Sequence, residues 1–235
     1  MDSQTRHALK QDKFVQATQS SVSWVETNRS SVIRLSVIGV LILAVLIAGA
    51  VFYNQRSRAA EGALGSALDV YSAPLAQPGA PTEKDVYATA AERSKAANQQ
   101  FVQVASQYGW LPEGGRAHYF AGLTYQELGQ TASAESELKI AADSWNSDLS
   151  TLAKFALAGF YHQTGRDAQA IDLYNAVAAK PSATVPAYTA QLALADLYAS
   201  TGKVDQAKQL WAKIKDADKT GSAGAIAAGK LSAKK

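Results

Sequence analysis

The sequence predicts an all-α protein in which a single transmembrane helix is followed by a short helical solenoid. Three observations support this fold class. Residues 35–55 carry no charged side chain. Alanine, the residue with the highest helix propensity, is abundant along the whole chain. A pattern of small and aromatic residues recurs after 36 and then 37 residues, as expected for stacked helix pairs.

The composition excludes several classes of protein. Hydrophobic residues form 47% of the chain and charged residues only 18%, which excludes a disordered protein. The absence of cysteine excludes disulfides, thiolate nucleophiles and thiolate metal sites. From residue 56 onward, 18 basic residues stand against 17 acidic ones. Because a nucleic-acid-binding face needs a basic stripe to neutralise phosphates, we expect no nucleic-acid partner.

Residues 35–55 form the predicted transmembrane helix, after a polar leader of residues 1–34. At 1.5 Å per residue this helix is about 31 Å long, which matches the hydrocarbon core of a bilayer. Phe52 and Tyr53 lie at one end, where aromatic rings favour the interface. A cleavable signal peptide is the alternative, because the Ala-Gly-Ala sequence of residues 48–50 resembles a cleavage site. The leader is much longer than a usual n-region, which favours an uncleaved anchor.

The flanking charges give a small bias in orientation. Two arginines lie beside each end of the helix: Arg29 and Arg34 before it, Arg56 and Arg58 after it. The leader adds Arg6, Lys10 and Lys13, and basic residues are enriched on the cytoplasmic side of membranes. We therefore expect a single-pass protein with its N-terminus in the cytoplasm and its C-terminal domain on the far side of the membrane.

Residues 56–82 are predicted to form a juxtamembrane helix followed by a proline-rich loop. Leu64, Leu68 and Tyr71 recur at helical spacing, and three prolines between residues 74 and 81 mark the loop. Thr82, with acidic residues directly after it, is typical of a helix start, and this helix is expected to continue to Tyr108.

Residues 83–215 contain the repeats. Each unit has a small residue, a tyrosine three residues later and a glycine four residues after that; a second small residue and a large apolar residue follow. The three sets are Gly122, Tyr125, Gly129, Ala134 and Leu138; Ala158, Tyr161, Gly165, Ala170 and Tyr174; and Ala195, Tyr198, Gly202, Ala207 and Trp211. Ala97 and Phe101 fit the second half of an earlier unit.

These residue types suit two helices packed at a short distance. The small residues allow the helices of a unit to touch, and the tyrosine packs on that contact. Glycine adopts the left-handed conformation that ends the first helix. The large apolar residue fills the seam to the next unit. Residues 216–235 are expected to form a capping helix or tail over the last seam.

This pattern resembles the tetratricopeptide repeat, whose period is near 34 residues. The usual tryptophan position holds His118, Lys154 and Gln191 instead, and the terminal proline occurs only near Pro181. The extra residues per unit are expected in the loops between units. An N-terminal anchor before a few such repeats is similar in layout to the periplasmic ancillary subunits of the Sec translocon. That resemblance implies a bacterial inner membrane with the C-terminal domain in the periplasm, and partners among translocon or periplasmic chaperone components.

No residue set in the sequence predicts catalysis, a cofactor or a metal site, so we expect no enzyme. His118 and His162 lack a second ligand at metal-binding spacing. The Gly114-Gly115 pair lacks the Lys-Ser/Thr of a phosphate-binding loop. The four tryptophans are expected in packing or interface roles, with Trp211 in a seam.

The first helix of each unit is predicted to line a concave, mainly apolar groove. The inward positions are Arg116, Tyr119, Leu123 and Gln126, then Leu152, Phe155 and His162, then Leu192 and Asp196. Such a groove suits hydrophobic segments of a protein partner. The alternative left open is that Tyr119 and Phe155 are covered by the chain's own helices.

Two functions are compatible with these features. The first is a membrane-anchored adaptor that captures partner proteins in the apolar groove. The second is a structural assembly subunit of a membrane complex that has no peptide ligand. The sequence predicts no particular oligomeric state.

Overall fold

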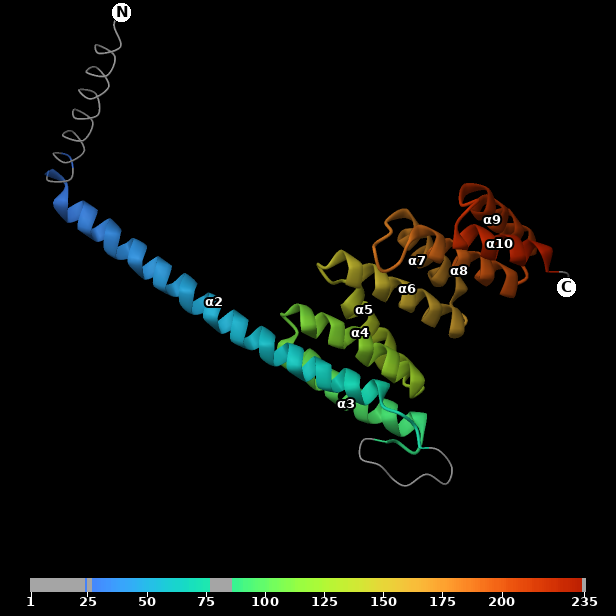
Figure 1. The fold of residues 1–235 in the computed structure, drawn as a ribbon, viewed down its shortest axis with the longest axis horizontal. Coiled ribbons are helices and arrows are strands. Elements are labelled where there is room, and N and C mark those ends of the chain that lie inside the picture. Colours follow the sequence, from blue (N-terminus) through green and yellow to red (C-terminus); the bar gives the residue numbers. More distant parts are fainter. Residues whose placement is uncertain (1–23, 25–26, 77–85, 234–235) are drawn as a thin grey trace, which may run out of the picture. The chain divides into compact units, whose positions relative to one another are not determined.

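The structure is a computed structural model that describes residue 24, residues 27–76 and residues 86–233. Its helices, shown in Figure 1, are α2 (Arg29–Ser72), α3 (Ala90–Tyr108), α4 (Pro112–Glu127), α5 (Thr131–Ala142), α6 (Ser147–Gln163), α7 (Asp167–Ala179), α8 (Ala187–Ser200), α9 (Val204–Ala217) and α10 (Ser222–Ser232). The described residues form helices and connections, with no strand. This confirms the all-α fold. The chain divides into two compact units, residues 1–55 and residues 56–235.

In the first unit, α2 is long and apolar enough to cross a membrane. Its large apolar side chains between residues 33 and 53, such as Leu43 and Val45, are exposed on all sides of the helix. A core helix of a water-soluble protein would bury one face, whereas this segment buries none within the described residues. Residues 1–23 of the expected leader lie outside the described residues.

In the second unit, α4 with α5, α6 with α7 and α8 with α9 form successive packed helix pairs. The first helix of each pair ends at a glycine with positive φ: 71° at Gly129, 74° at Gly165 and 80° at Gly202. Around Gly129, its N–H donates to the Gln126 carbonyl at 3.0 Å and the Gln130 N–H donates to the Tyr125 carbonyl at 2.8 Å. These are the two hydrogen bonds of a Schellman cap, and both recur at the other two glycines. The predicted left-handed caps are confirmed.

The small residues lie where the two helices of a pair touch. A Cβ placed on Gly122 would come within 2.6 Å of Leu138 Cγ, so α4 and α5 pack closely only because this side chain is absent. Ala158 and Ala195 occupy the equivalent positions and are fully buried. The small residues therefore set the helix spacing in each pair, as the pattern predicts.

The C-terminal part of α2, from residue 56, completes the earlier unit. Ala60, Leu64 and Ala67 share a buried core with Ala97 and Phe101 of α3. From the sequence, only the second helix of this unit was predicted, and residues 56–72 were interpreted as part of a juxtamembrane segment. The difference arises because α2 lacks the tyrosine and glycine of the other units at the repeat spacing. Its buried positions are recognisable only by what packs on them.

Polar contacts link this earliest repeat unit, formed by residues 56–72 and α3, to α4 of the next repeat unit. Tyr71 Oη donates to Glu127 Oε1 at 2.7 Å, and Ser94 Oγ donates to Glu127 Oε2. Partial burial and the Glu127 carboxylate raise the pKa of Tyr71 to about 12. The phenol therefore stays protonated and remains a hydrogen-bond donor at physiological pH.

The helix expected to start at Thr82 begins later. Residues 82–85 lie outside the described residues, but residues 86–89 are not helical and α3 starts at Ala90. The Thr89 hydroxyl accepts a hydrogen bond from the Glu92 N–H at 3.1 Å, which is the same capping chemistry seven residues further on. Just before the cap, Tyr87 pairs with Leu75 in an isolated β-bridge, which keeps residues 86 and 87 extended. The predicted end at Tyr108 is confirmed.

The last helix, α10, packs against α9 and α8. Ala227 is fully buried in the same cluster as Trp211 and Ile214, and Lys230 Nζ contacts both carboxylate oxygens of Asp196 at 2.9 Å. A helix thus covers the final seam, as expected for the end of a solenoid.

Candidate functional site: an apolar pocket beside Trp145

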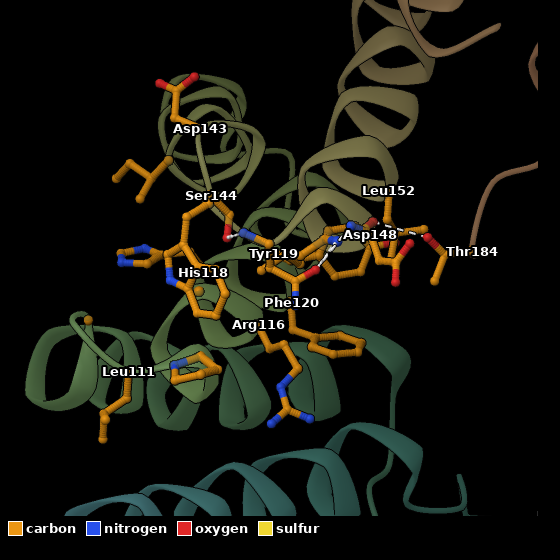
Figure 2. A pocket seen from close by; sticks show the side chains of 17 residues that line it. Leu111, Arg116, His118, Tyr119, Phe120, Asp143, Ser144, Asp148, Leu152 and Thr184 are labelled. Atoms are coloured by element: carbon orange, nitrogen blue, oxygen red, sulfur yellow. Dashed lines mark hydrogen bonds between the residues drawn. The ribbon is translucent and has the colours of Figure 1, made fainter. Parts of the chain in front are cut away.

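A pocket of about 690 Å³ lies between the start of α4, the end of α5 and the start of α6 (Figure 2). Leu111, Pro112, Tyr119, Phe120, Ile140, Trp145, Leu149 and Leu152 provide its apolar walls, and Gly109, Gly115, Arg116, His118, Asp143, Ser144, Asn146, Asp148 and Thr184 line the rest. The volume falls within the range of about 300–1,000 Å³ typical of sites that enclose a ligand or an anchoring side chain.

The deep part of the pocket is held by core packing. Leu111 and Leu149 are buried, and the Tyr119 ring packs edge-on to Phe120 with centroids 5.2 Å apart. Phe120 in turn stacks on buried Phe101 of α3 at 5.2 Å. Burial raises the pKa of Tyr119 above its ordinary value, so its hydroxyl stays neutral. These walls are rigid and apolar because they are continuous with the solenoid core.

The rim carries two large exposed apolar side chains. Trp145 is 80% exposed and Ile140 is 47% exposed. Trp145 lies in the connection between α5 and α6, whose backbone is held by local hydrogen bonds. The Asn146 side-chain oxygen accepts from the N–H groups of Asp148 and Leu149 at 3.0 and 3.1 Å, which caps α6. Ser144 Oγ accepts from the Asn146 N–H at 3.2 Å. A well-fixed turn therefore holds a tryptophan in solvent.

A second loop forms the opposite side of the pocket. Thr184, between α7 and α8, donates from its hydroxyl to the Asp148 carbonyl at 3.0 Å. The Ala183 N–H donates to Asp148 Oδ1 at 3.3 Å. Buried Val185 anchors this loop against Val177 and α8. Two successive inter-unit connections thus meet at the start of α6.

The charges around the pocket differ in how they are compensated. Arg116 donates to Glu113 at 3.0 Å, and His118 Nδ1 lies 2.6 Å from Glu137 Oε2. Asp143 and Asp148 form no ion pair with any described residue. Figure 2 shows the two aspartates at different edges of the pocket. The uncompensated charge around the pocket is therefore negative.

The structure brings part of the predicted groove together. Arg116, Tyr119 and Leu152 line the pocket. Leu123 and Phe155 pack instead on the core between the units, where Phe155 meets the Tyr174 ring with centroids 5.4 Å apart.

The remaining groove positions make polar or packing contacts within the described solenoid. Gln126 donates to Gln163 at 2.6 Å, and His162 contacts Asp167 at 2.6 Å and Ser200 at 3.2 Å. Leu192 packs near Trp211, and Asp196 is paired with Lys230.

Most of the pocket rim was not predicted from the sequence. Trp211 is buried in a seam as expected, but Trp145 is largely exposed rather than packed. A signal was present, because Trp145 has polar residues on both sides, at 143–144 and 146–148, in a short connection between two helices. Ile140, Asp143 and Asp148 carried no such signal.

The arrangement is suited to binding an apolar group. Among the residues that the structure describes, no group of three or more His, Asp or Glu side chains could hold a metal ion.

A cluster of paired charges around Glu135 lies outside the pocket lining. There the Glu135 pKa is lowered to about 2 by Lys139, Arg166 and the Tyr161 hydroxyl. These groups satisfy one another across α5, α6 and α7 and serve packing between units.

Comparison with known proteins identifies the fold. No family model matches the chain, and no curated protein matches it. Two solved structures are similar: a putative kinesin light chain of Podosopora anserina with nearly identical TPR-like repeats, and a point variant of the same protein. Each has a TM-score of 0.51 and 19% sequence identity, over 60% of this chain and 76% of that one. At this identity the similarity extends to the fold alone. The repeat region has the tetratricopeptide-like fold.

Proposed function

We propose that this protein is a membrane-anchored adaptor that binds a partner protein through the pocket beside Trp145. The exposed tryptophan at the edge of an apolar pocket carries the proposal. Exposing a large aromatic ring in water is unfavourable, and here a capped turn holds the ring there rather than allowing it to pack. Tryptophan, tyrosine and arginine are the residues that most often dominate protein–protein binding energy, and all three lie at this pocket.

The membrane helix supports a tethering role. We place the anchor in residues 35–55 of α2, with the N-terminus in the cytoplasm and the repeats in the periplasm of a bacterial inner membrane. Tethering raises the effective concentration of the repeats near other membrane components, so that a weak pocket becomes useful. The layout of one anchor followed by a few degenerate repeats supports partners among translocon or periplasmic chaperone components.

A topology experiment tests the anchor. A reporter that is active only in the periplasm, fused after Lys235, should be active in cells, while the same reporter fused before Met1 should be inactive. The reverse pattern would contradict the orientation. Release of the repeat domain as a shorter soluble product would contradict an uncleaved anchor.

Site-specific crosslinking tests the adaptor role. A benzophenone-bearing photo-crosslinking amino acid, which keeps an aromatic ring at the rim, replaces Trp145 or Ile140, and Gln169 on the exposed surface of α7 serves as the matched control. We expect one defined protein adduct from the two rim positions and none from the control. The same partner should be lost when Tyr119 is changed to Ala in the Ile140 crosslinking variant.

The two functions differ in the expected outcome. A structural subunit without a peptide ligand would give adducts from many surface positions or from α2, and Tyr119→Ala would leave them unchanged. That result would remove the adaptor proposal. Equal adduct formation from Gln169 and Trp145 would do the same.

A further inference from the structure

We propose that the partner segment bound by this pocket combines a bulky apolar side chain with a nearby lysine or arginine. This inference rests on the proposed function and specifies the chemistry of the ligand. It follows from two separate features of the pocket, its apolar walls and its uncompensated negative charge.

The apolar feature selects the anchor. The pocket has a volume of about 690 Å³, and its walls include Leu111, Tyr119, Phe120 and Leu149, which are buried or packed against the core. A leucine, phenylalanine or tryptophan side chain would be stabilised there, because its apolar surface would leave water. A polar side chain would lose its hydration there without a matching gain.

The charge feature selects the neighbour of that anchor. Asp143 directly follows the last residue of α5, where the helix dipole is negative and disfavours an acid. Asp148 lies in the first turn of α6, where the helix dipole favours an acid, and its carboxylate accepts one backbone N–H, but it has no cationic partner among the described residues. An incoming cation would relieve the repulsion at the first site and pair with the charge at the second.

The nearby basic side chains do not cancel these acids. Arg116 pairs with Glu113, and His118 pairs with Glu137, so each already has an acidic partner. Glu135, at the seam between two repeats, is by contrast neutralised by cations, because it contacts Lys139 and Arg166 within 2.8 Å. The two pocket aspartates lack such contacts within the described part of the chain.

The exposed Trp145 ring strengthens the preference for a cation. Its face is available at the rim, and an ammonium or guanidinium group over an indole ring is attracted electrostatically by the negative face of the ring. A basic side chain beside the apolar anchor can therefore contact the ring as well as one of the aspartates. Glutamate or aspartate at that place would be repelled.

Peptide binding to the full-length protein in lipid nanodiscs tests the proposal. Four fluorescent ten-residue peptides are compared by anisotropy at about 50 mM salt. Each has a Gly/Ser background into which the test residues are placed. The first carries a central Leu-Phe pair flanked by Lys, the second the same pair flanked by Ser, the third the pair flanked by Glu, and the fourth Lys without the apolar pair. We expect the first to bind at least about fivefold more tightly than the second, and the third and fourth to bind most weakly.

Two substitutions assign the charge effect to the pocket. Asp143→Asn and Asp148→Asn should each weaken the Lys-flanked peptide about two- to fivefold, the size expected for a solvent-exposed ion pair. Neither should alter binding of the Ser-flanked peptide. Asp172→Asn, an exposed acid on α7, is the matched control and should change neither peptide. Raising salt to about 500 mM should remove the Lys advantage, because the screening length shortens to a few ångströms.

The outcomes separate this inference from the proposed function. Equal binding of the Lys-flanked and Ser-flanked peptides, lost in Trp145→Ala, would overturn the charge preference and leave the pocket as a binding site. Binding of the Lys-only peptide as tight as the first would show plain charge attraction and overturn the combined ligand. Failure of all four peptides to bind would also overturn it, and the crosslinking experiment would then decide on the adaptor function by itself.

Discussion

Two of the connections between successive repeats, α5–α6 and α7–α8, place an apolar side chain in opposite environments. In the connection between α5 and α6, Trp145 is 80% exposed beside a pocket. In the connection between α7 and α8, Val185 is 2% exposed and packs against Val177 and Ala190. The helices on either side follow the same pattern of small residue, tyrosine and glycine cap in both places.

This difference separates the scaffold from the binding surface. The repeated residues set helix spacing and helix ends, so they make each unit alike. The connections are free of those constraints, and two of them carry an exposed tryptophan: Trp110 between α3 and α4, and Trp145 between α5 and α6. Towards the C-terminus, α10 covers the last seam through Ala227 and Lys230. The stability of the solenoid and its binding capacity should therefore respond to different substitutions.

The largest expected contrast is between two tryptophans. Trp211→Ala removes a ring that is 7% exposed in the C-terminal core and should lower the free energy of unfolding by about 3–5 kcal/mol. Trp145→Ala should change it by less than about 0.5 kcal/mol, because the ring makes little packing contact. Thermal unfolding followed by circular dichroism measures both. In the crosslinking experiment the order should reverse, so that Trp145→Ala reduces adduct formation more than Trp211→Ala does. A destabilisation by Trp145→Ala as large as that by Trp211→Ala would contradict the distinction between scaffold and binding surface.

Two glycines give the next contrast. Gly122→Ala places a methyl group against Leu138 and should destabilise the protein by about 1–3 kcal/mol, because the two helices must move apart. Gly159→Ala meets only the Tyr174 hydroxyl at 3.6 Å, an ordinary contact, and should be neutral or stabilising by up to about 1 kcal/mol through helix propensity. Denaturant unfolding of the two variants compares them directly. Equal destabilisation would show that close helix contact at Gly122 is not required.

The third contrast compares stability at different pH values and concerns Glu135, which lies between the α4–α5 and α6–α7 repeats. Glu135, with its pKa lowered to about 2 from an ordinary 4.5, stabilises the fold above pH 4.5 and loses that contribution as the pH falls towards 2. Glu135→Gln should cost about 1 kcal/mol at pH 7, a value reduced for solvent screening. The difference from the natural protein should shrink between pH 4.5 and pH 2. A difference that stays constant over that range would contradict the ionic role, and Asp172→Asn serves as the control.

The smallest effect is expected where α10 closes the solenoid. The Lys230–Asp196 pair is about half exposed on both sides, so Lys230→Ala should cost less than about 1 kcal/mol and less still at high salt. Ala227→Asp, which puts a charge into the buried seam, should cost several times more. Thermal unfolding at two salt concentrations measures both. A larger loss for Lys230→Ala would mean that the ion pair, rather than apolar burial, holds the cap.

Much of the repeat fold was predictable because its constraints are local. Gly129, Gly165 and Gly202 adopt the expected backbone conformation, and Ala158 and Ala195 are buried as expected. The first helix of the earliest unit was missed because Ala60 and Ala67 do not follow the repeat pattern. The start of α3 was misplaced because several residues between 82 and 92 offer capping chemistry, and Thr89 caps the helix.

The site was predicted only in part. Arg116, Tyr119 and Leu152 line the pocket, but Phe155 belongs to the seam and Asp196 is covered by Lys230. Helical periodicity identifies which face of a helix a residue lies on, but not which neighbouring helix or loop covers it. Asp143 and Asp148 could not be found from the sequence, because their importance depends on the pocket between them.

By itself, the sequence determined the all-α class, the apolar segment at residues 35–55, the helix caps and the close helix contacts, since each depends on residues near one another in the chain. The tertiary structure alone decided that residues 56–72 complete a unit, that Trp145 stays in solvent and that two connections enclose a pocket at the start of α6. These features depend on contacts between residues tens of positions apart. Such contacts form only when the helices stack, and a local pattern does not specify which surface the stacking leaves uncovered.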